Sequence, residues 1–188
     1  MLARYKFLRL SNGKIRSESG DVEWQVGEWR EEEGAPILCD NGFHCSVKPY
    51  DALCYVRGEV IARVEVEGPS VVVEDKECWM RMRLVQIWRW EKKDNVKLAI
   101  FAAEKVLHFY EERHPGDVRP RKAIEAAKKY LDDPSAAAYA AYAARAARAG
   151  AAAAADAADA AAYAAARAEF LDEINAWIEN HLAELCPI

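Results

Sequence analysis

Two stretches, EVIARVEVEG at residues 59–68 and WMRMRLVQIWRW at residues 79–90, decide the fold of the first half of the chain. In the first stretch the side chains alternate, so that one side carries Val60, Ala62, Val64 and Val66 and the other carries Ile61, Arg63, Glu65 and Glu67. A period of two places successive side chains on opposite faces of an extended strand. The alternation therefore predicts a strand that is buried on one face and solvated on the other.

The second stretch predicts a partner strand of the same kind. We expect one face to carry Met80, Met82, Leu84, Trp88 and Trp90, and the other to carry Trp79, Arg81, Arg83, Val85, Ile87 and Arg89. Three guanidinium groups on one face could bind an anion or a nucleotide. Alternatively, carboxylates of the preceding strand, including Glu65 and Glu67, could form cross-strand ion pairs with them. The ion pairs are the interpretation that we favour.

Turn signals organise the rest of this half into a β-rich domain. Asn12-Gly13 lies between two strand-like runs and predicts a tight hairpin, because both residues tolerate positive φ. Asn41-Gly42 predicts a second turn. The segment KPYDALCYV that follows predicts a short helix, with Pro49 in its first turn and Gly58 just past its end.

The composition changes near residue 92, and helical signals dominate from there onward. We expect Asp94 to cap a helix that runs to about Arg113, a second helix to start near Pro120, and Pro134 to open a third. Residues 136–168 are mostly alanine, which is the best helix former. The sequence thus predicts an α+β protein, with an antiparallel β-rich domain at 1–92 and an alanine-rich helical bundle at 93–188.

Overall composition excludes several classes of protein. The chain has 188 residues, 52% of them hydrophobic, and a formal net charge of −5. This charge argues against nucleic-acid binding, which needs an excess of Lys and Arg. No uninterrupted apolar run is long enough to cross a membrane, and basic residues interrupt the N-terminus where a signal peptide would need its apolar core. We therefore expect a cytoplasmic protein without membrane contact.

The stretch CDNGFHCS at residues 39–46 is the first candidate site. His44 could act as a general base or contact a nucleotide, with Glu65, Glu67 or Asp51 as its carboxylate partner. Alternatively, the stretch is only a turn that leads Phe43 into a core. The cysteines lack the paired spacing of zinc ligands, so we predict no metal site. We also expect no cofactor, unless the nucleotide interpretation holds.

The stretch DVRPRKAIEA at residues 117–126 is the second candidate site. Arg119 and Arg121 flank Pro120 near the predicted start of a helix, and Asp117 could cap the turn. Arginine at a helix start is unfavourable to the helix dipole unless a carboxylate or carbonyl compensates it. The loop therefore either fixes how two helices meet, which we favour, or recognises an acidic partner.

Several motifs resemble known families. YKFLRLSNG, WQVGEW, CDNGFHCSVKPYDALCYV, IARVEVEG and EDKECWMRMRLVQIW, within about residues 4–90, resemble a family of small phage and prophage proteins of unassigned function. Residues of about 97–168, which include DVRPRKAIEA, resemble the helical region of immunity-protein-like proteins. The layout of the GFHCS strand, the short helix and the IARVEV strand is also similar to the nicotinamide pocket of ADP-ribosyltransferases, but without a glutamate in that family's catalytic context.

These resemblances imply three possible functions. The first is a non-enzymatic accessory protein of phage type, acting in the host cytosol, which binds another protein as an immunity protein or as an inhibitor of a host factor. The second is a nucleotide-binding domain, an ADP-ribosyltransferase-like enzyme or a ligand sponge, which binds nicotinamide dinucleotide or another nucleotide through His44, Tyr55, Arg81 and Arg83. The third is an assembly protein that forms homo-oligomers through its alanine-rich helices. We favour the first.

Overall fold

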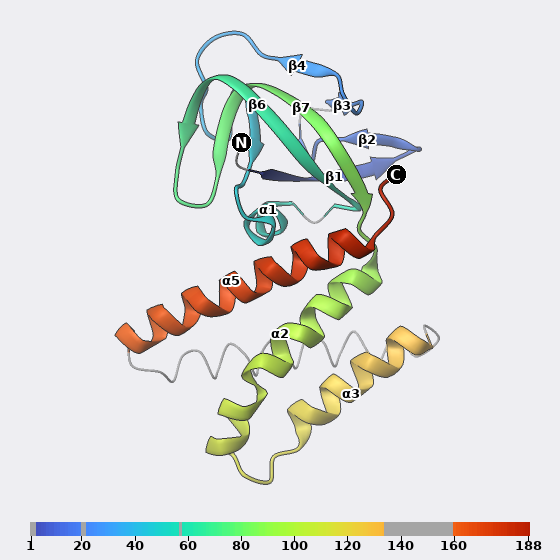
Figure 1. Cartoon of the computed structure of the whole chain (residues 1–188), viewed down its shortest axis with the longest axis vertical. Helices are drawn as coiled ribbons and strands as arrows, with labels where there is room; N and C mark the ends of the chain where they lie inside the picture. The colour runs from blue at the N-terminus through green and yellow to red at the C-terminus, as the bar shows by residue number, and fades with distance from the viewer. Residues whose placement is uncertain (1–2, 20–21, 57, 134–159) are drawn as a thin grey trace. The chain divides into compact units, whose positions relative to one another are not determined.

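The computed structural model describes residues 3–19, 22–56, 58–133 and 160–188, which are drawn in colour in Figure 1. The chain divides into two compact units, one formed by Met1–Trp90 together with Asn175–Ile188 and the other by Glu91–Ile174. An antiparallel sheet precedes long helices, which confirms the predicted α+β class. Within the described ranges, no helix has the length and apolar character that a membrane span requires.

The first unit contains a seven-stranded sheet in the order β3-β2-β1-β6-β7-β4, with β5 also paired to β7. All of these pairs are antiparallel. Long, curved β6 and β7 form its centre (Figure 1). The strands are β1 (Arg4–Ser11), β2 (Lys14–Arg16), β3 (Glu23–Trp24), β4 (Trp29–Glu31), β5 (Phe43–Cys45), β6 (Val60–Val72) and β7 (Glu77–Arg89).

The sheet curls on itself because β5 connects its two sides. β5 pairs with β7, and directly after β5 the backbone of Ser46 exchanges two hydrogen bonds with Tyr5 of β1, at 2.8 and 2.9 Å. Such closure satisfies strand edges that would otherwise be open. A buried apolar cluster forms the core of this half-barrel: Leu8, Trp24, Phe43, Cys45, Val60, Ala62, Val64, Met82, Leu84 and Ile87.

The predicted core face of β6 is confirmed, but Ile61 on the face predicted to be solvated is also fully buried, and the predicted faces of β7 are correct only as far as residue 84. Val64 pairs with Leu84, but Arg63 pairs with Gln86, so Val85 is an extra residue in a β-bulge. A bulge reverses the alternation beyond it, because two residues face one on the partner strand. Ile87, which we expected beside the arginines, is therefore buried in the core cluster at 6% exposure. Trp88 points to the opposite face.

The predicted hairpin turn at Asn12-Gly13 and the short helix are confirmed, whereas the second turn lies at residues 38–40, with Cys39 at a φ of 66° and Asn41 bridged back to Ile37. Asn12 and Gly13 adopt φ values of 52° and 75° between β1 and β2, as a hairpin with two left-handed residues requires. Helix α1 (Pro49–Tyr55) begins at the predicted proline. Gly58 follows this helix at a point of close backbone approach, where an added Cβ would lie 2.0 Å from the carbonyl oxygen of Leu8.

The last residues of the chain belong to the first unit. Helix α5 (Ala160–Glu184) contributes its C-terminal part, from Asn175 onward. The Asn175 side chain accepts a hydrogen bond of 2.9 Å from the backbone N–H of Tyr50, one of the donors that the first turn of α1 leaves unpaired. His181 stacks on Trp177 at 4.9 Å and meets Trp90 edge-on at 5.9 Å.

The second unit contains the helices α2 (Lys92–Arg113) and α3 (Arg119–Asp132). α3 begins beside Pro120 as predicted, but the N-cap of α2 is Glu91 and not Asp94. Asp94 is instead the third helical residue of a capping box, and its carboxylate accepts a 2.7 Å hydrogen bond from the backbone N–H of Glu91. Between the two helices lies a small core of Ile100, Ala103, Ile124 and Ala127.

The predicted third helix from Pro134 and most of the alanine-rich tract lie outside the described residues. The predictions of an alanine-rich helical bundle at 93–188 and of homo-oligomers formed through its helices depend on that segment. They therefore stay predictions.

Candidate functional site

His44 lies on β5 in a neutral, hydrogen-bonded state. Its Nε2 accepts a 2.9 Å hydrogen bond from the backbone N–H of Cys39. Burial, together with the positive charges of Lys6 and Lys76, lowers the pKa of His44 to about 4. The prediction that Glu65 or Glu67 is the carboxylate partner of His44 is wrong, because both carboxylates pair with arginines. A ring nitrogen that already accepts a backbone N–H acts as part of the turn and not as a free base.

Tyr55 lies near the same turn and is connected to it through Lys76. The Tyr55 hydroxyl donates a 2.6 Å hydrogen bond to Asp75, which is the main reason that its pKa rises to about 12. Lys76 places its Nζ 4.5 Å from the centre of the Tyr55 ring and donates to the Cys39 Sγ at 3.1 Å. The fold thus brings His44 and Tyr55 into one polar cluster at the surface.

Arg81 and Arg83 form the cross-strand ion pairs that the sequence favoured. Arg83 Nε donates to Glu65 at 2.7 Å, and Arg81 pairs with Glu67. Both guanidinium groups also lie over the ring of Trp29 from β4, at 4.8 and 4.4 Å. A phosphate at these arginines would compete with the existing ion pairs to Glu65 and Glu67, which disfavours a nucleotide site on this face.

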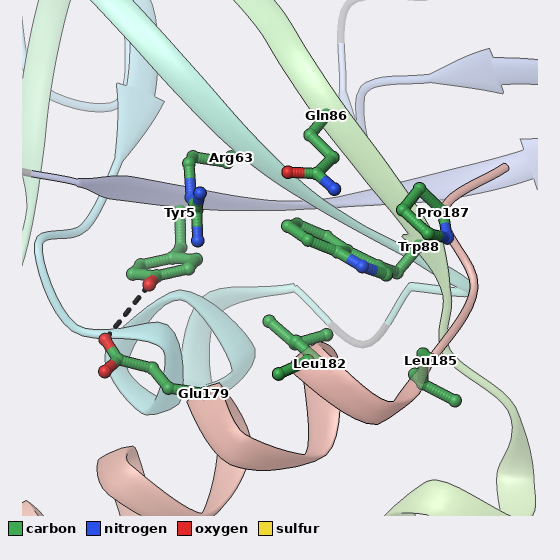
Figure 2. Close-up of a pocket in the computed structure, with 9 residues that line it drawn as sticks. Tyr5, Arg63, Gln86, Trp88, Glu179, Leu182, Leu185 and Pro187 are labelled. Carbon is green, nitrogen blue, oxygen red and sulfur yellow. Dashed lines mark hydrogen bonds between the residues drawn. The ribbon is translucent and has the colours of Figure 1, made fainter.

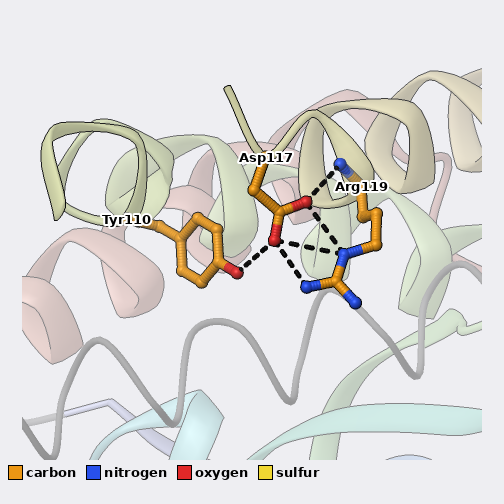
Figure 3. Close-up of polar contacts among 3 residues, drawn as sticks. All are labelled: Tyr110, Asp117 and Arg119. Carbon is orange, nitrogen blue, oxygen red and sulfur yellow. Dashed lines mark hydrogen bonds and ion pairs between the residues drawn. The ribbon is translucent and has the colours of Figure 1, made fainter. Parts of the chain in front are cut away.

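Arg119 and Asp117 organise the loop between α2 and α3 (Figure 3). Asp117 accepts the backbone N–H of Arg119 at 3.1 Å and pairs with its guanidinium at 2.6 Å. Tyr110 of α2 donates to the same carboxylate at 2.7 Å. These contacts hold the pKa of Asp117 well below its usual range. The predicted compensation of an arginine at a helix start is therefore confirmed, with Asp117 as the carboxylate.

Arg121 completes the connection between the two helices through a bidentate ion pair with Glu111, at 2.8 and 2.7 Å. The C-terminal part of α2 and the start of α3 nevertheless present large side chains to solvent. Phe109 and Val118 are 50% and 49% exposed, and the side chain of Arg119 is 85% exposed. We refer to Phe109, Val118 and Arg119 as the hairpin tip. It combines a hydrogen-bonded connection between the helices with exposed aromatic, aliphatic and guanidinium groups.

A pocket of about 240 Å³ lies in the first unit, where the C-terminal segment crosses the outer face of the sheet (Figure 2). Its wall includes the Tyr5 hydroxyl, which donates a 3.0 Å hydrogen bond to Glu179. Burial and the neighbouring carboxylate of Glu179 raise the pKa of Tyr5. The remaining lining residues are Arg63, Gln86, Trp88, Leu182, Ala183, Leu185 and Pro187.

Sequence reasoning missed this pocket for a specific reason. Arg63 was placed correctly on the outer face of β6, but the bulge at Val85 is what turns Trp88 toward the same face. Glu179 comes from a helix more than one hundred residues away in the chain. In the described ranges no group of three or more His, Cys, Asp or Glu side chains could hold a metal ion.

The protein is thus an α+β protein with a curled sheet and a separate helical unit that presents an ordered hairpin tip. Two family models match the chain in that order. Residues 6–95 match a domain of unknown function, DUF7666, and residues 86–169 match a family described as "Imm-5 like putative immunity protein". No curated protein and no solved structure matches the chain. The second match fits a protein that binds another protein.

Proposed function

We propose that the protein is a non-enzymatic, partner-binding protein of immunity type, and that the hairpin tip contacts the partner. The observation that carries this proposal is the match of residues 86–169 to the immunity-like family, because it includes the whole of α2 and α3 and the loop between them. Two kinds of partner fit: a toxic effector that the protein neutralises, or a host factor that a phage-type protein inhibits.

The hairpin tip supports the proposal through its composition and its order. Aromatic and arginine side chains supply most hot spots of protein interfaces. The ion pairs of Asp117 with Arg119 and of Glu111 with Arg121 hold the loop before binding, which reduces the entropy lost when a partner docks. The His44 region gives less support to a nucleotide-binding function, because the side chains of His44, Arg81 and Arg83 already form hydrogen bonds or ion pairs within the chain.

A matched pair of double variants tests the proposal. The tagged protein captures its partner from cells that encode it, and the affinity for the purified partner is then measured for Val118→Ser/Arg119→Ser and for Val72→Ser/Arg89→Ser. Both variants replace one exposed valine and one exposed arginine. Exposed ion pairs contribute at most about 1 kcal/mol to stability, so both variants should fold.

We expect the hairpin variant to bind at least about tenfold more weakly, since loss of two hot-spot side chains costs at least 1.4 kcal/mol. The sheet variant should bind like the wild type. Equal affinities of the two variants for the partner would overturn the assignment of the hairpin tip. Circular dichroism and urea unfolding confirm that each variant is folded.

A further inference from the structure

The pocket of Figure 2 has a polar end with unused hydrogen-bonding capacity. Arg63 and Gln86 are directly opposite each other on β6 and β7, and both line the pocket. Among the described residues Arg63 forms no ion pair, although its side chain interacts with the Tyr5 hydroxyl and its guanidinium lies 5.6 Å from the centre of the Trp88 ring. Gln86 likewise has no side-chain hydrogen bond within that set.

Glu179 gives the same end a negative group. Only one of its carboxylate oxygens, Oε1, accepts the hydrogen bond from Tyr5. Its second oxygen has no partner among the described residues. Tyr5 itself is 2% exposed, so its hydroxyl is fixed in position between the positive group of Arg63 and the negative group of Glu179. A ligand group with both charges would complement this end of the pocket.

The opposite end of the pocket is apolar. In Figure 2, Arg63, Tyr5 and Glu179 gather at one end, Leu185 and Pro187 lie at the other, and Trp88 lies between them. The backbone fixes that apolar end, because Pro187 bridges to Trp88 and the N–H of Ile188 donates to the carbonyl of Ile87 at 3.1 Å. Trp88 is only 3% exposed, but with Leu185 and Pro187 it lines an apolar wall that suits an apolar or aromatic ligand body.

We propose that this pocket binds a free, zwitterionic amino acid with an apolar side chain. The ligand carboxylate accepts hydrogen bonds from Arg63 and Gln86, its ammonium group donates to the open oxygen of Glu179, and its side chain lies along Trp88. A volume of about 240 Å³ is below the roughly 300–1,000 Å³ of sites for drug-sized ligands, so a dinucleotide would not fit. A simple anion would meet the negative charge of Glu179 without compensation.

Titration of the ¹⁵N-labelled full chain with three related probes tests the proposal. L-phenylalanine carries both charges, 3-phenylpropionate lacks the ammonium group, and phenethylamine lacks the carboxylate. The readout is the chemical shift of the Trp88 indole N–H, assigned with Trp88→Phe. We expect saturable binding of L-phenylalanine with a Kd on the order of 1 mM, as for a ligand of this size, and at least about tenfold weaker binding of both other probes.

A comparison of Arg63→Gln with Arg89→Gln distinguishes binding at the pocket from a general effect of surface charge on L-phenylalanine binding. Both residues are exposed and lie on neighbouring strands, but only Arg63 lines the pocket. Arg63→Gln should weaken L-phenylalanine binding at least about tenfold, and Arg89→Gln should leave it unchanged. The proposal is overturned by no saturable shift up to about 20 mM, by equal binding of 3-phenylpropionate, or by equal effects of the two variants. None of these outcomes depends on the hairpin tip.

Discussion

Replacement of Gly58 by alanine is expected to lower the free energy of unfolding by at least about 3 kcal/mol. The added Cβ would lie 2.0 Å from the Leu8 carbonyl oxygen and 2.6 Å from its carbonyl carbon, so the clash is with backbone and not with a flexible side chain. Relief of the clash requires β1 and the start of β6 to separate, and Leu8 and Val60 at that point are both fully buried. Urea unfolding followed by tryptophan fluorescence measures the loss.

Gly68→Ala is the matched control for this prediction. Gly68 also lies in the first unit, has φ of +85°, and has nothing within 4 Å of an added Cβ. Alanine there carries only the penalty of a left-handed conformation, about 1–2 kcal/mol. If Gly58→Ala lowers the free energy of unfolding no more than Gly68→Ala does, the close approach of Gly58 to the backbone of Leu8 in β1 is contradicted.

The second large effect is expected on acidification, when His44 becomes protonated. Its pKa is about 4 in the folded protein and 6.5 in the unfolded chain. Between these values the unfolded chain binds more protons, so the free energy of unfolding falls as the pH is lowered from 6.5 toward 4. The shift corresponds to at most about 3 kcal/mol, and solvent screening of this half-buried ring reduces that amount.

His44→Gln should abolish most of this pH dependence while keeping the fold. The glutamine oxygen can accept the N–H of Cys39 in place of Nε2, and it does not titrate. Unfolding free energies of both proteins at pH 7, 6, 5 and 4.5 give the comparison. Parallel curves for wild type and variant would show that His44 is not the group responsible.

Local sequence signals predicted most individual elements of the fold. The left-handed pair Asn12-Gly13, the proline at the start of α1 and the alternation in β6 each specify a conformation by short-range sterics and burial. The cross-strand pairs of Arg81 with Glu67 and Arg83 with Glu65 followed from the same alternation. These features needed no knowledge of distant segments.

Features that depend on long-range pairing could not be predicted in this way. The bulge at Val85 arises from how β7 pairs with β6, and no residue type in that strand marks it. The closure of the sheet through Ser46 and the position of Glu179 beside Tyr5 each join segments far apart in the chain. The pocket depends on the bulge, which turns Trp88 toward it, and on Glu179, which comes from the other end of the chain. For that reason it was absent from the predicted sites.

The two candidate sites lie in different units of the chain, so their functions can be tested independently. The hairpin tip belongs to the helical unit, Glu91–Ile174, whereas all residues of the pocket belong to the unit that contains the sheet. Arg63→Gln should therefore leave the affinity for a protein partner unchanged when no amino acid is present. Conversely, Val118→Ser/Arg119→Ser should leave L-phenylalanine binding unchanged.

Neutralisation of the captured partner is the measurement that tests the immunity-type function most directly. The gene for the partner is expressed in a naive bacterial host, alone and together with the wild-type protein or the Val118→Ser/Arg119→Ser variant, and colony-forming units are counted. We expect the partner to be toxic alone, the wild type to restore growth, and the hairpin variant to restore it poorly. A partner that is harmless when expressed alone would exclude neutralisation of a toxic effector and leave inhibition of a host factor. A toxic partner whose effect the wild-type protein does not relieve would contradict an immunity-type function.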